Sequence, residues 1–323
     1  MPHTIVVLDP LTPERLARMR AFLPQGFALK AAASRDEADQ LAAMRDADFA
    51  IAGDIAITGA MMREGAAHRM QAVHKWGVGV DNIACDVAAE VGLRVLRTTG
   101  SNARAVAETT LALMLALQRN VVPGNDGMRR GEWLKGTIGP RTFLLTGRTV
   151  GLIGLGYIGK NVAKMLAGFD CRVLYAKPTP LPPEEAEALN VTHVPVETLI
   201  AESDIISLHC ALTDKTANLL DAAAFAAMKD DVVIVNTARG GILDESALAD
   251  ALRGGKVRGA ALDVFEVEPT PPGHPLIGLD NVIATPHIAS QAADTYGKTV
   301  GRMFENLRRV AEGEEVPALD VVV

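Results

Sequence analysis

Three polar clusters in the second half of the sequence could together carry proton transfer and anion binding. Arg239 follows an apolar run and is flanked by glycines, so its guanidinium could fork onto a carboxylate in a way that a lysine could not. In residues 260–269, acidic side chains follow the end of another apolar run, and His287 follows a third apolar run. A histidine paired with a carboxylate is a suitable proton donor near neutral pH, because the anion stabilises the imidazolium and orients the ring. Taken singly, a histidine after a strand is more often structural than catalytic.

A glycine-rich turn near the middle of the chain has the spacing of a dinucleotide-binding motif. The apolar run 149–153 leads into the pattern G-x-G-x-x-G, and a helical pattern follows it. Gly154 would permit the tight turn, Gly156 would let backbone amides approach a pyrophosphate at the helix N-terminus, and Gly159 would let the helix pack against the strand. Such turns also occur for packing reasons alone, but here the strand before and the helix after are both indicated. The candidate coenzyme contacts in this segment are Gly154, Gly156, Tyr157, Ile158 and Gly159.

The end of the next strand bears on the choice of coenzyme. A site that prefers NAD usually carries Asp or Glu there, about twenty residues beyond the glycines, to bind the ribose hydroxyls. This chain has Ala176 followed by Lys177. The missing carboxylate removes repulsion against a 2′-phosphate and the ammonium would attract one, so we predict NADP as the preferred coenzyme and Lys177 as a contact. The alternative is that Lys177 points to solvent and the site accepts NADP or NAD.

The elements that must position these residues alternate along the whole chain. Short runs rich in β-branched residues are separated by longer helical patterns, which indicates βαβ units and parallel sheets with helices on both faces. Two longer helical patterns, 103–120 and 290–313, are expected to connect the two halves, and the stretch 123–146 is expected to be irregular. The strands that we predict are 4–9, 49–53, 72–76, 94–98, 149–154, 172–176, 205–210, 232–237, 260–265 and 282–285.

Composition argues against several classes of protein. The 323 residues, 49% of them apolar, are enough for two domains with buried cores, and a net charge of −7 with scattered Lys and Arg gives no attraction for nucleic acid. The N-terminal residues are typical of a first strand and not of a signal peptide, and the apolar stretch 111–117 is too short for a membrane span. Cys85, Cys171 and Cys210 show neither pairing nor metal-ligand spacing, so we predict a cytoplasmic protein without a metal site.

Four segments, in the same order along the chain, make the sequence similar to the D-isomer-specific 2-hydroxyacid dehydrogenase family, and in particular to its glyoxylate and hydroxypyruvate reductases. The segments are 150–156, 235–240, 262–269 and 285–289, and the resemblance extends over nearly the whole length. It implies an NAD(P)-dependent oxidoreductase in which Arg239 binds the substrate carboxylate and keto oxygen, His287 is the catalytic acid and base, and Glu268 is its carboxylate partner.

The same resemblance implies further contacts with substrate and coenzyme. The backbone amides of Val78 and Gly79, in a glycine-rich loop, would hold the substrate carboxylate. Asp263 would contact the nicotinamide carboxamide, Val106 would lie near the nicotinamide ring, and His209 would line the adenosine region. Thr237 and Ala238, which precede Arg239, are also implied to contact the coenzyme. The coenzyme contacts implied by the resemblance are therefore Val106, His209, Thr237, Ala238 and Asp263.

The fold that the resemblance implies is α/β, with two doubly wound parallel-sheet domains and the active site in the cleft between them. Residues 99–289 would form a Rossmann-type coenzyme domain. Residues 1–98 with 290–323 would form a discontinuous, flavodoxin-like substrate domain. The helix from Ala103 and the stretch around Trp133 match the region through which relatives dimerise, so a homodimer is expected.

The sequence constrains the substrate less than the reaction. Because no extra basic cluster and no appended regulatory domain are evident, we predict the reduction of glyoxylate or hydroxypyruvate in preference to a phosphorylated keto acid. A dehydrogenase of phosphite, formate or another small anion on the same fold is an alternative. A non-catalytic, dinucleotide-sensing corepressor is a second alternative, but it would be expected to lack a catalytic residue or to carry a long disordered tail.

Overall fold

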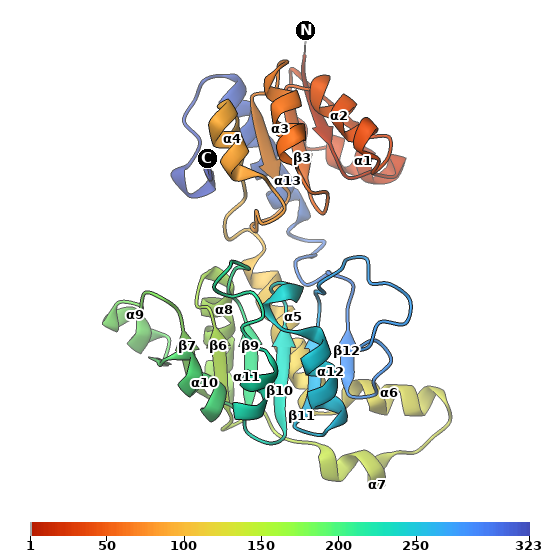
Figure 1. Cartoon of the computed structure of the whole chain (residues 1–323), viewed down its shortest axis with the longest axis vertical. Coiled ribbons are helices and arrows are strands. Elements are labelled where there is room, and N and C mark those ends of the chain that lie inside the picture. Colours follow the sequence, from red (N-terminus) through yellow and green to blue (C-terminus); the bar gives the residue numbers. More distant parts are fainter. Residues whose placement is uncertain (1) are drawn as a thin grey trace. The chain divides into compact units, whose positions relative to one another are not determined.

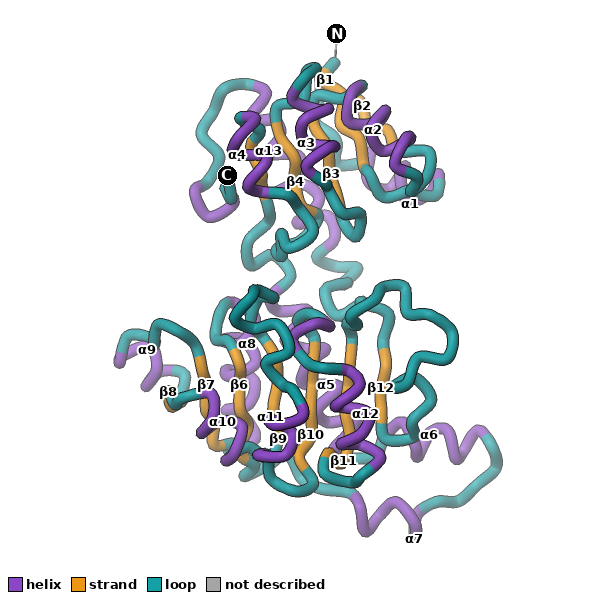
Figure 2. The backbone as a smooth tube through the Cα atoms, viewed as in Figure 1, coloured by secondary structure: helices purple, strands orange, loops and turns teal. Residues whose placement is uncertain are grey.

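The computed structural model describes residues 2–323, which form two compact units. Unit 1 comprises the described residues up to Asn102 together with Ala292–Val323, and unit 2 comprises Ala103–Gln291. Each unit is a parallel β-sheet with helices on both faces (Figures 1 and 2). The prediction of an α/β protein with two doubly wound sheets is therefore confirmed.

Unit 2 contains a seven-stranded sheet in which every neighbouring pair of strands is parallel. The order β12-β11-β10-β9-β6-β7-β8 runs outward in both directions from the β6/β9 pair. This is a Rossmann-type order, and ligands bind such sheets at the carboxyl edge beside the point of reversal. The strands are β6 (Thr149–Ile153), β7 (Arg172–Ala176), β8 (Val191–His193), β9 (Ile205–Leu208), β10 (Val232–Asn236), β11 (Val257–Leu262) and β12 (Val282–Ala284).

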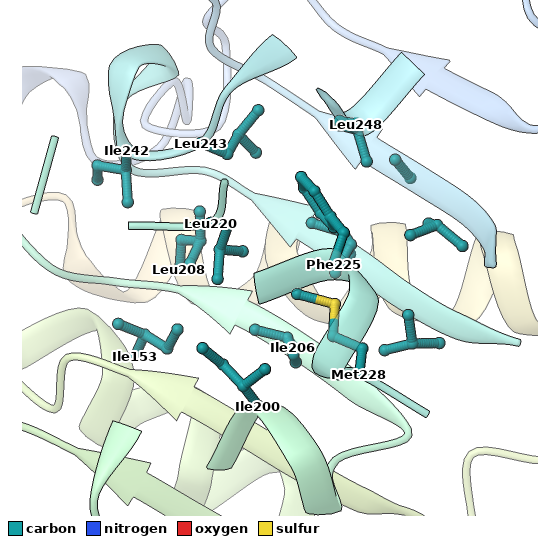
Figure 3. Packing of buried hydrophobic residues seen from close by; sticks show 14 of the residues in the cluster. Ile153, Ile200, Ile206, Leu208, Leu220, Phe225, Met228, Ile242, Leu243 and Leu248 are labelled. Carbon is teal, nitrogen blue, oxygen red and sulfur yellow. The ribbon is translucent and has the colours of Figure 1, made fainter. Parts of the chain in front are cut away.

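Helices cover both faces of this sheet because its strands alternate apolar side chains between two cores. Along β6, Val150 and Leu152 pack into one core and Ile153 into the other. Figure 3 shows the second core, where Ile206 of the sheet meets Phe225 of a covering helix. The first face carries α5 (Ala103–Gln118) and α8 (Tyr157–Leu166), and the second carries α10 (Val196–Glu202), α11 (Ala222–Ala227) and α12 (Glu245–Arg253); α9 (Pro183–Ala188) precedes β8.

Unit 1 contains a five-stranded parallel sheet in the order β2-β1-β3-β4-β5, which is the flavodoxin-like order. The C-terminal helix α13 packs on this sheet with α1, so the last residues of the chain belong to unit 1. The strands are β1 (His3–Val7), β2 (Phe27–Ala31), β3 (Phe49–Ala52), β4 (Ala72–Lys75) and β5 (Arg94–Leu96). The helices are α1 (Pro13–Arg20) and α13 (Tyr296–Ala311) on one face and α2 (Glu37–Arg45), α3 (Gly59–Ala66) and α4 (Cys85–Val91) on the other.

The stretch 123–146 is not irregular throughout, so that prediction is partly wrong. It contains most of α6 (Val121–Arg129), the short helix α7 (Lys135–Ile138) and a 3₁₀ turn at Gly139–Arg141. Pro123, Gly124 and Gly127 have low helix propensity and hid α6 in the sequence, but a proline is tolerated in the first turn, where its missing N–H has no acceptor. In Figure 1, α6 and α7 extend away from the unit 2 sheet.

The longest helices of the described chain, α5 and α13, have 16 residues each. No helix between residues 2 and 323 is long and apolar enough to cross a membrane.

Candidate active site

His287 and Glu268 are hydrogen-bonded at the carboxyl edge of the unit 2 sheet. His287 Nδ1 lies 2.7 Å from Glu268 Oε2. This bond raises the pKa of His287 above its ordinary value, although burial opposes the shift. Burial alone would raise the pKa of Glu268, but the hydrogen bonds from His287 and from the Phe265 amide outweigh it, and that pKa lies below its ordinary value. The pair therefore favours an imidazolium beside a carboxylate, and the other ring nitrogen, Nε2, has no partner among the described residues.

A backbone amide fixes the second oxygen of Glu268. The Phe265 N–H donates to Glu268 Oε1 at 2.9 Å, so each oxygen of this carboxylate has its own donor. The turn after β11 thus bends the Glu268 side chain back over its own backbone and aims it at His287. Glu266, two residues earlier, is exposed and makes no such contact through its side chain.

Asp263 holds the loop that carries His287. His287 has a φ of 52°, in the left-handed region that residues other than glycine rarely adopt. Its N–H donates to Asp263 O at 2.8 Å, and the amides of Ile288 and Ala289 donate to the Asp263 carboxylate at 2.9 and 2.8 Å. The Thr285 hydroxyl donates to the same carboxylate, and Asp263 as a whole is only 1% exposed. Asp263 therefore offsets the backbone strain at His287, and its contact with a nicotinamide stays a prediction.

Arg239 follows β10 in a tight loop that a buried asparagine closes. The Asn236 side chain accepts a hydrogen bond from the Ala238 N–H at 3.0 Å and donates one to Arg239 O at 2.8 Å. In turn, Arg239 Nη1 donates to Ala238 O at 2.7 Å. Beyond the hydrogen bond and the burial described above, the charge of Arg239 lowers the pKa values of both Glu268 and His287. The charge of the guanidinium thus acts on both members of the pair.

The loop that carries Arg239, after β10, and the loop that carries Glu268, after β11, touch through their backbones at Gly240. A Cβ at Gly240 would lie 1.9 Å from the carbonyl carbon of Phe265 and 2.2 Å from the nitrogen of Glu266. Only glycine permits this approach. The contact explains why residues that follow two neighbouring strands, Arg239 after β10 and Glu268 after β11, come together at one edge of the sheet.

The glycine-rich turn after β6 has the geometry that a pyrophosphate requires. Gly154 has a φ of 94°, and a Cβ at Gly159 would lie 2.6 Å from Gly154 O, so α8 packs directly on the turn. A Cβ at Gly156 would have no atom within 4 Å, and no side chain of the described residues caps α8. The amides of Tyr157 and Ile158 in the first helical turn have no intrahelical acceptor, so phosphate oxygens could accept from them. These residues fit a dinucleotide.

Lys177 follows β7 beside this turn. The Gly154 N–H donates to Ala176 O at 2.9 Å, which joins the end of β7 to the glycine turn. The carbonyl of Lys177 lies 3.1 Å from His193 Nε2. In the part of the chain that the structure describes, no acceptor contacts the half-buried side chain of Lys177. Its ammonium is therefore available to a ligand.

Three other expected coenzyme contacts lie around the same edge of the sheet. His209 Nε2 is 2.9 Å from the Ser207 hydroxyl, and burial lowers the pKa of His209 to about 4, so the ring is neutral near neutral pH. The Thr237 and Thr110 hydroxyls are 2.9 Å apart, and the Thr110 hydroxyl donates to Val106 O at 2.7 Å. Thr237 and Val106, which is 4% exposed, are thus joined through one residue of α5.

In unit 1, the loop with Val78 and Gly79 begins at a glycine of unusual conformation. Gly77 has a φ of 143°, which side chains rarely adopt. Beyond the loop, Lys75 Nζ donates to Asn82 Oδ1 at 2.8 Å and so joins its two ends. The N–H groups of Val78 and Gly79 donate to no acceptor among residues 2–323. Two adjacent unpaired amides of this kind suit an anion.

Sequence reasoning missed the side chains that support the site. Asn236 lies inside the arginine segment, and its position just after a buried strand could have marked it as the residue that closes the loop. Thr110 and Glu245 gave no such signal. Their partners, Thr237 and the Glu266 N–H, come from distant parts of the chain and only the fold brings them together.

Comparisons with known proteins agree with this geometry. Residues 111–289 match the family described as D-isomer specific 2-hydroxyacid dehydrogenase, NAD binding domain. A hydroxypyruvate reductase of Thermotoga maritima is 42% identical over 244 residues, which are 75% of this chain and 78% of that protein. A D-3-phosphoglycerate dehydrogenase of Archaeoglobus fulgidus is 39% identical over 251 residues, which are 77% of this chain but only 46% of that protein, so the match spans about half of that relative. The crystal structure of an NAD-dependent formate dehydrogenase from Staphylococcus aureus in complex with NAD superposes with a TM-score of 0.88 at 26% identity, covering 99% of each chain.

Proposed function

The chain belongs to the D-isomer specific 2-hydroxyacid dehydrogenase family, and from that membership we propose that it transfers a hydride between a nicotinamide dinucleotide and a small 2-keto or D-2-hydroxy acid. The reaction that we assign is the reduction of glyoxylate or hydroxypyruvate. The observation that carries the proposal is the 2.7 Å contact between His287 and Glu268 within the influence of Arg239. It supplies a proton donor and a carboxylate-binding cation at the ligand-binding edge of the sheet.

We assign the coenzyme to unit 2, and two backbone donors for the substrate to unit 1. The residues proposed to hold the coenzyme surround the carboxyl edge of the unit 2 sheet, where the glycine turn offers uncapped amides. They are Val106, Gly154, Gly156, Tyr157, Ile158, Gly159, Lys177, His209, Thr237, Ala238 and Asp263.

In the direction of reduction, His287 acts as the proton donor. A bound nicotinamide dinucleotide supplies the hydride that the keto carbon receives. His287 gives its Nε2 proton to the keto oxygen, while Glu268 keeps the ring charged and oriented. In unit 2, Arg239 binds the substrate carboxylate. Because negative charge develops on the keto oxygen beside Arg239 and His287, their stabilisation is largest in the transition state.

We propose NADP as the preferred coenzyme, and Lys177 as the residue that prefers it. The support is a half-buried ammonium at the end of β7 and the absence of an acidic side chain at Ala176. Lys177→Ala is expected to lower kcat/KM for NADPH about five- to tenfold and to leave the value for NADH unchanged, because a partly exposed charge pair contributes about 1 kcal/mol. Steady-state rates with each coenzyme at saturating keto acid measure both values.

Lys164, an exposed lysine of α8, provides the matched control, and Lys164→Ala should change neither value. Equal losses with both coenzymes in the Lys177 variant would contradict the assignment, and so would no loss with NADPH.

A homodimer is the assembly that we propose. The segment from α6 to β6 gathers exposed apolar side chains, and Trp133 is 78%, Met128 58% and Leu144 60% exposed. Large apolar side chains exposed in one segment of the chain suit an interaction surface. Trp133→Glu is expected to weaken self-association by about thirtyfold or more, since a central aromatic residue contributes about 2 kcal/mol or more.

Sedimentation velocity across a dilution series measures this effect. Ile277→Glu is the control and should sediment as the wild type does. Ile277 is a residue of unit 2 that is 45% exposed and lies outside the segment from α6 to β6. A wild-type protein that is monomeric at every concentration would disprove the proposal.

The cytoplasm is the compartment that we propose. All three cysteines are unpaired, and burial raises the pKa of Cys210 to about 11, which keeps it a thiol. Unpaired thiols are usual in a reducing compartment.

A panel of substrates tests the proposed reaction against its alternatives. We expect coenzyme oxidation with glyoxylate and with hydroxypyruvate, and no coenzyme reduction with phosphite or formate. Turnover with phosphite or formate alone would replace the proposal with a small-anion dehydrogenase. Tight coenzyme binding without turnover of any of the four would favour a dinucleotide-sensing corepressor.

A further inference from the structure

Unit 2 contains a second histidine–carboxylate pair besides His287 and Glu268, and this second pair is buried. His274 Nε2 is 2.8 Å from Glu245 Oε2, and the side chains are only 7% and 10% exposed. Glu245 is the first residue of α12, and His274 belongs to the loop between β11 and β12 that also carries Glu268. The proposed reaction uses neither residue.

The hydrogen bonds of His274 indicate the tautomer of its ring. The Leu276 N–H points at His274 Nδ1 at 3.3 Å, so Nδ1 is an acceptor and the ring proton sits on Nε2. Nε2–H therefore donates to Glu245. The Phe265 ring packs edge-on against the imidazole, with centroids 5.4 Å apart, and closes the apolar side of the pair. A carboxylate buried in this way is retained only if donors satisfy it.

The other oxygen of Glu245 reaches the backbone beside the catalytic glutamate. Glu245 Oε1 accepts the Glu266 N–H at 2.8 Å, while the preceding amide, that of Phe265, donates to Glu268 Oε1 at 2.9 Å. Two consecutive N–H groups are thus divided between the buried carboxylate and the catalytic one. On its other side the Phe265–Glu266 peptide touches Gly240, which adjoins Arg239.

The Phe265–Glu266 peptide is linked to all three candidate catalytic residues, Arg239, Glu268 and His287. It contacts the loop that carries Arg239 directly. The N–H of the preceding peptide, that of Phe265, orients Glu268, and Glu268 orients His287. Residues 263–281 contain no helix or strand, so no sheet or helix hydrogen bonds hold this peptide. Its N–H bonds instead to the side chain of Glu245, the first residue of α12.

We propose that His274 and Glu245 are positioning residues that hold the Phe265–Glu266 peptide and thereby aim Glu268 at His287. The consequence for turnover rests on the proposed function, but the effect on His287 does not. Three charged groups act on His287: Glu268, whose hydrogen bond raises its pKa most, Arg239, which lowers it, and Asp263, which raises it. Releasing Glu268 removes the first of these effects, so the pKa of His287 should fall.

The test compares His274→Phe, which keeps the ring against Phe265 but has no donor, with the conservative His274→Gln, which keeps an N–H donor near the position of Nε2. A second loss variant, Glu245→Gln, changes almost no volume. Its single oxygen can serve either the Glu266 amide or His274, but not both. Titration of ring-labelled histidine by NMR, with His287→Gln to assign the signal, gives the His287 midpoint in each protein without any substrate.

We expect the His287 midpoint to move to lower pH in His274→Phe and Glu245→Gln and to stay near the wild-type value in His274→Gln. In His274→Phe and Glu245→Gln, kcat should also fall about ten- to a hundredfold, as for other residues that orient a group in contact with the reacting atoms. In His274→Gln, kcat should stay near the wild-type value. The coenzyme Kd should be unchanged in all three variants. An unmoved midpoint in both loss variants overturns the inference, even if kcat falls. If the wild type turns over no keto acid, the proposed function fails, and the midpoints still decide whether the pair positions Glu268.

Discussion

His287→Gln is expected to lower kcat for keto-acid reduction by about a hundredfold to ten-thousandfold, the usual contribution of a positioned general acid. Glutamine keeps much of the volume of histidine and can still donate an N–H to Glu268, but its amide is not acidic enough to protonate the keto oxygen. The coenzyme Kd should stay unchanged, because the glycine turn and the residues after β7 do not involve His287. Steady-state kinetics and a fluorescence titration with NADPH measure the two quantities separately.

His68 offers the matched control for this variant. It is an exposed histidine of unit 1, bonded to the backbone carbonyl of Glu64, and His68→Gln should be as active as the wild type. A His287→Gln enzyme with wild-type kcat would remove His287 from the chemistry.

The second large effect is expected at Arg239. Arg239→Gln should lower kcat/KM for the keto acid by about thirty- to several thousandfold, because losing one partner of a hydrogen-bonded charge pair costs about 2–5 kcal/mol. Both KM and kcat should change, since the guanidinium binds the carboxylate in the ground state and faces the developing oxygen charge in the transition state. Arg239→Lys should recover only part of the loss, because an ammonium cannot make the two parallel hydrogen bonds.

Substrate titrations of these two variants and of Arg253→Gln test this. Arg253 is on α12 of the same unit, 52% exposed, and bonded to Asp250, so its loss should leave kcat and KM unchanged. If Arg239→Gln retained the wild-type KM, the carboxylate would have to bind elsewhere.

The sheets and the edge that carries the site could be predicted from the sequence because their signals are local. Apolar runs covered on both faces predict parallel strands, and the carboxyl ends of parallel strands meet at one edge. Polar residues such as Arg239 and His287 that directly follow two of those runs must therefore come near each other. The short edge strands β2 and β8 were missed, because their few residues, three in β8, give no clear apolar run.

The predictions that failed concern residues whose structure depends on contacts with residues far away in the sequence. The strand predicted at 260–265 ends at Leu262, and the next side chain, that of Asp263, holds the amides of the loop that carries His287. Phe265 is buried not as a strand residue but against His274. The His274–Glu245 pair joins residues 29 positions apart, and no local pattern marks either of them.

The most direct test of the proposed reaction is the initial rate of hydroxypyruvate reduction by the purified wild-type protein with NADPH, followed by chiral analysis of the product. We predict steady turnover and D-glycerate as the product, with a rate that falls as the pH rises through the raised pKa of His287, because only the imidazolium can donate the proton. No turnover of hydroxypyruvate or glyoxylate with either coenzyme, or formation of L-glycerate, would contradict the proposed reaction.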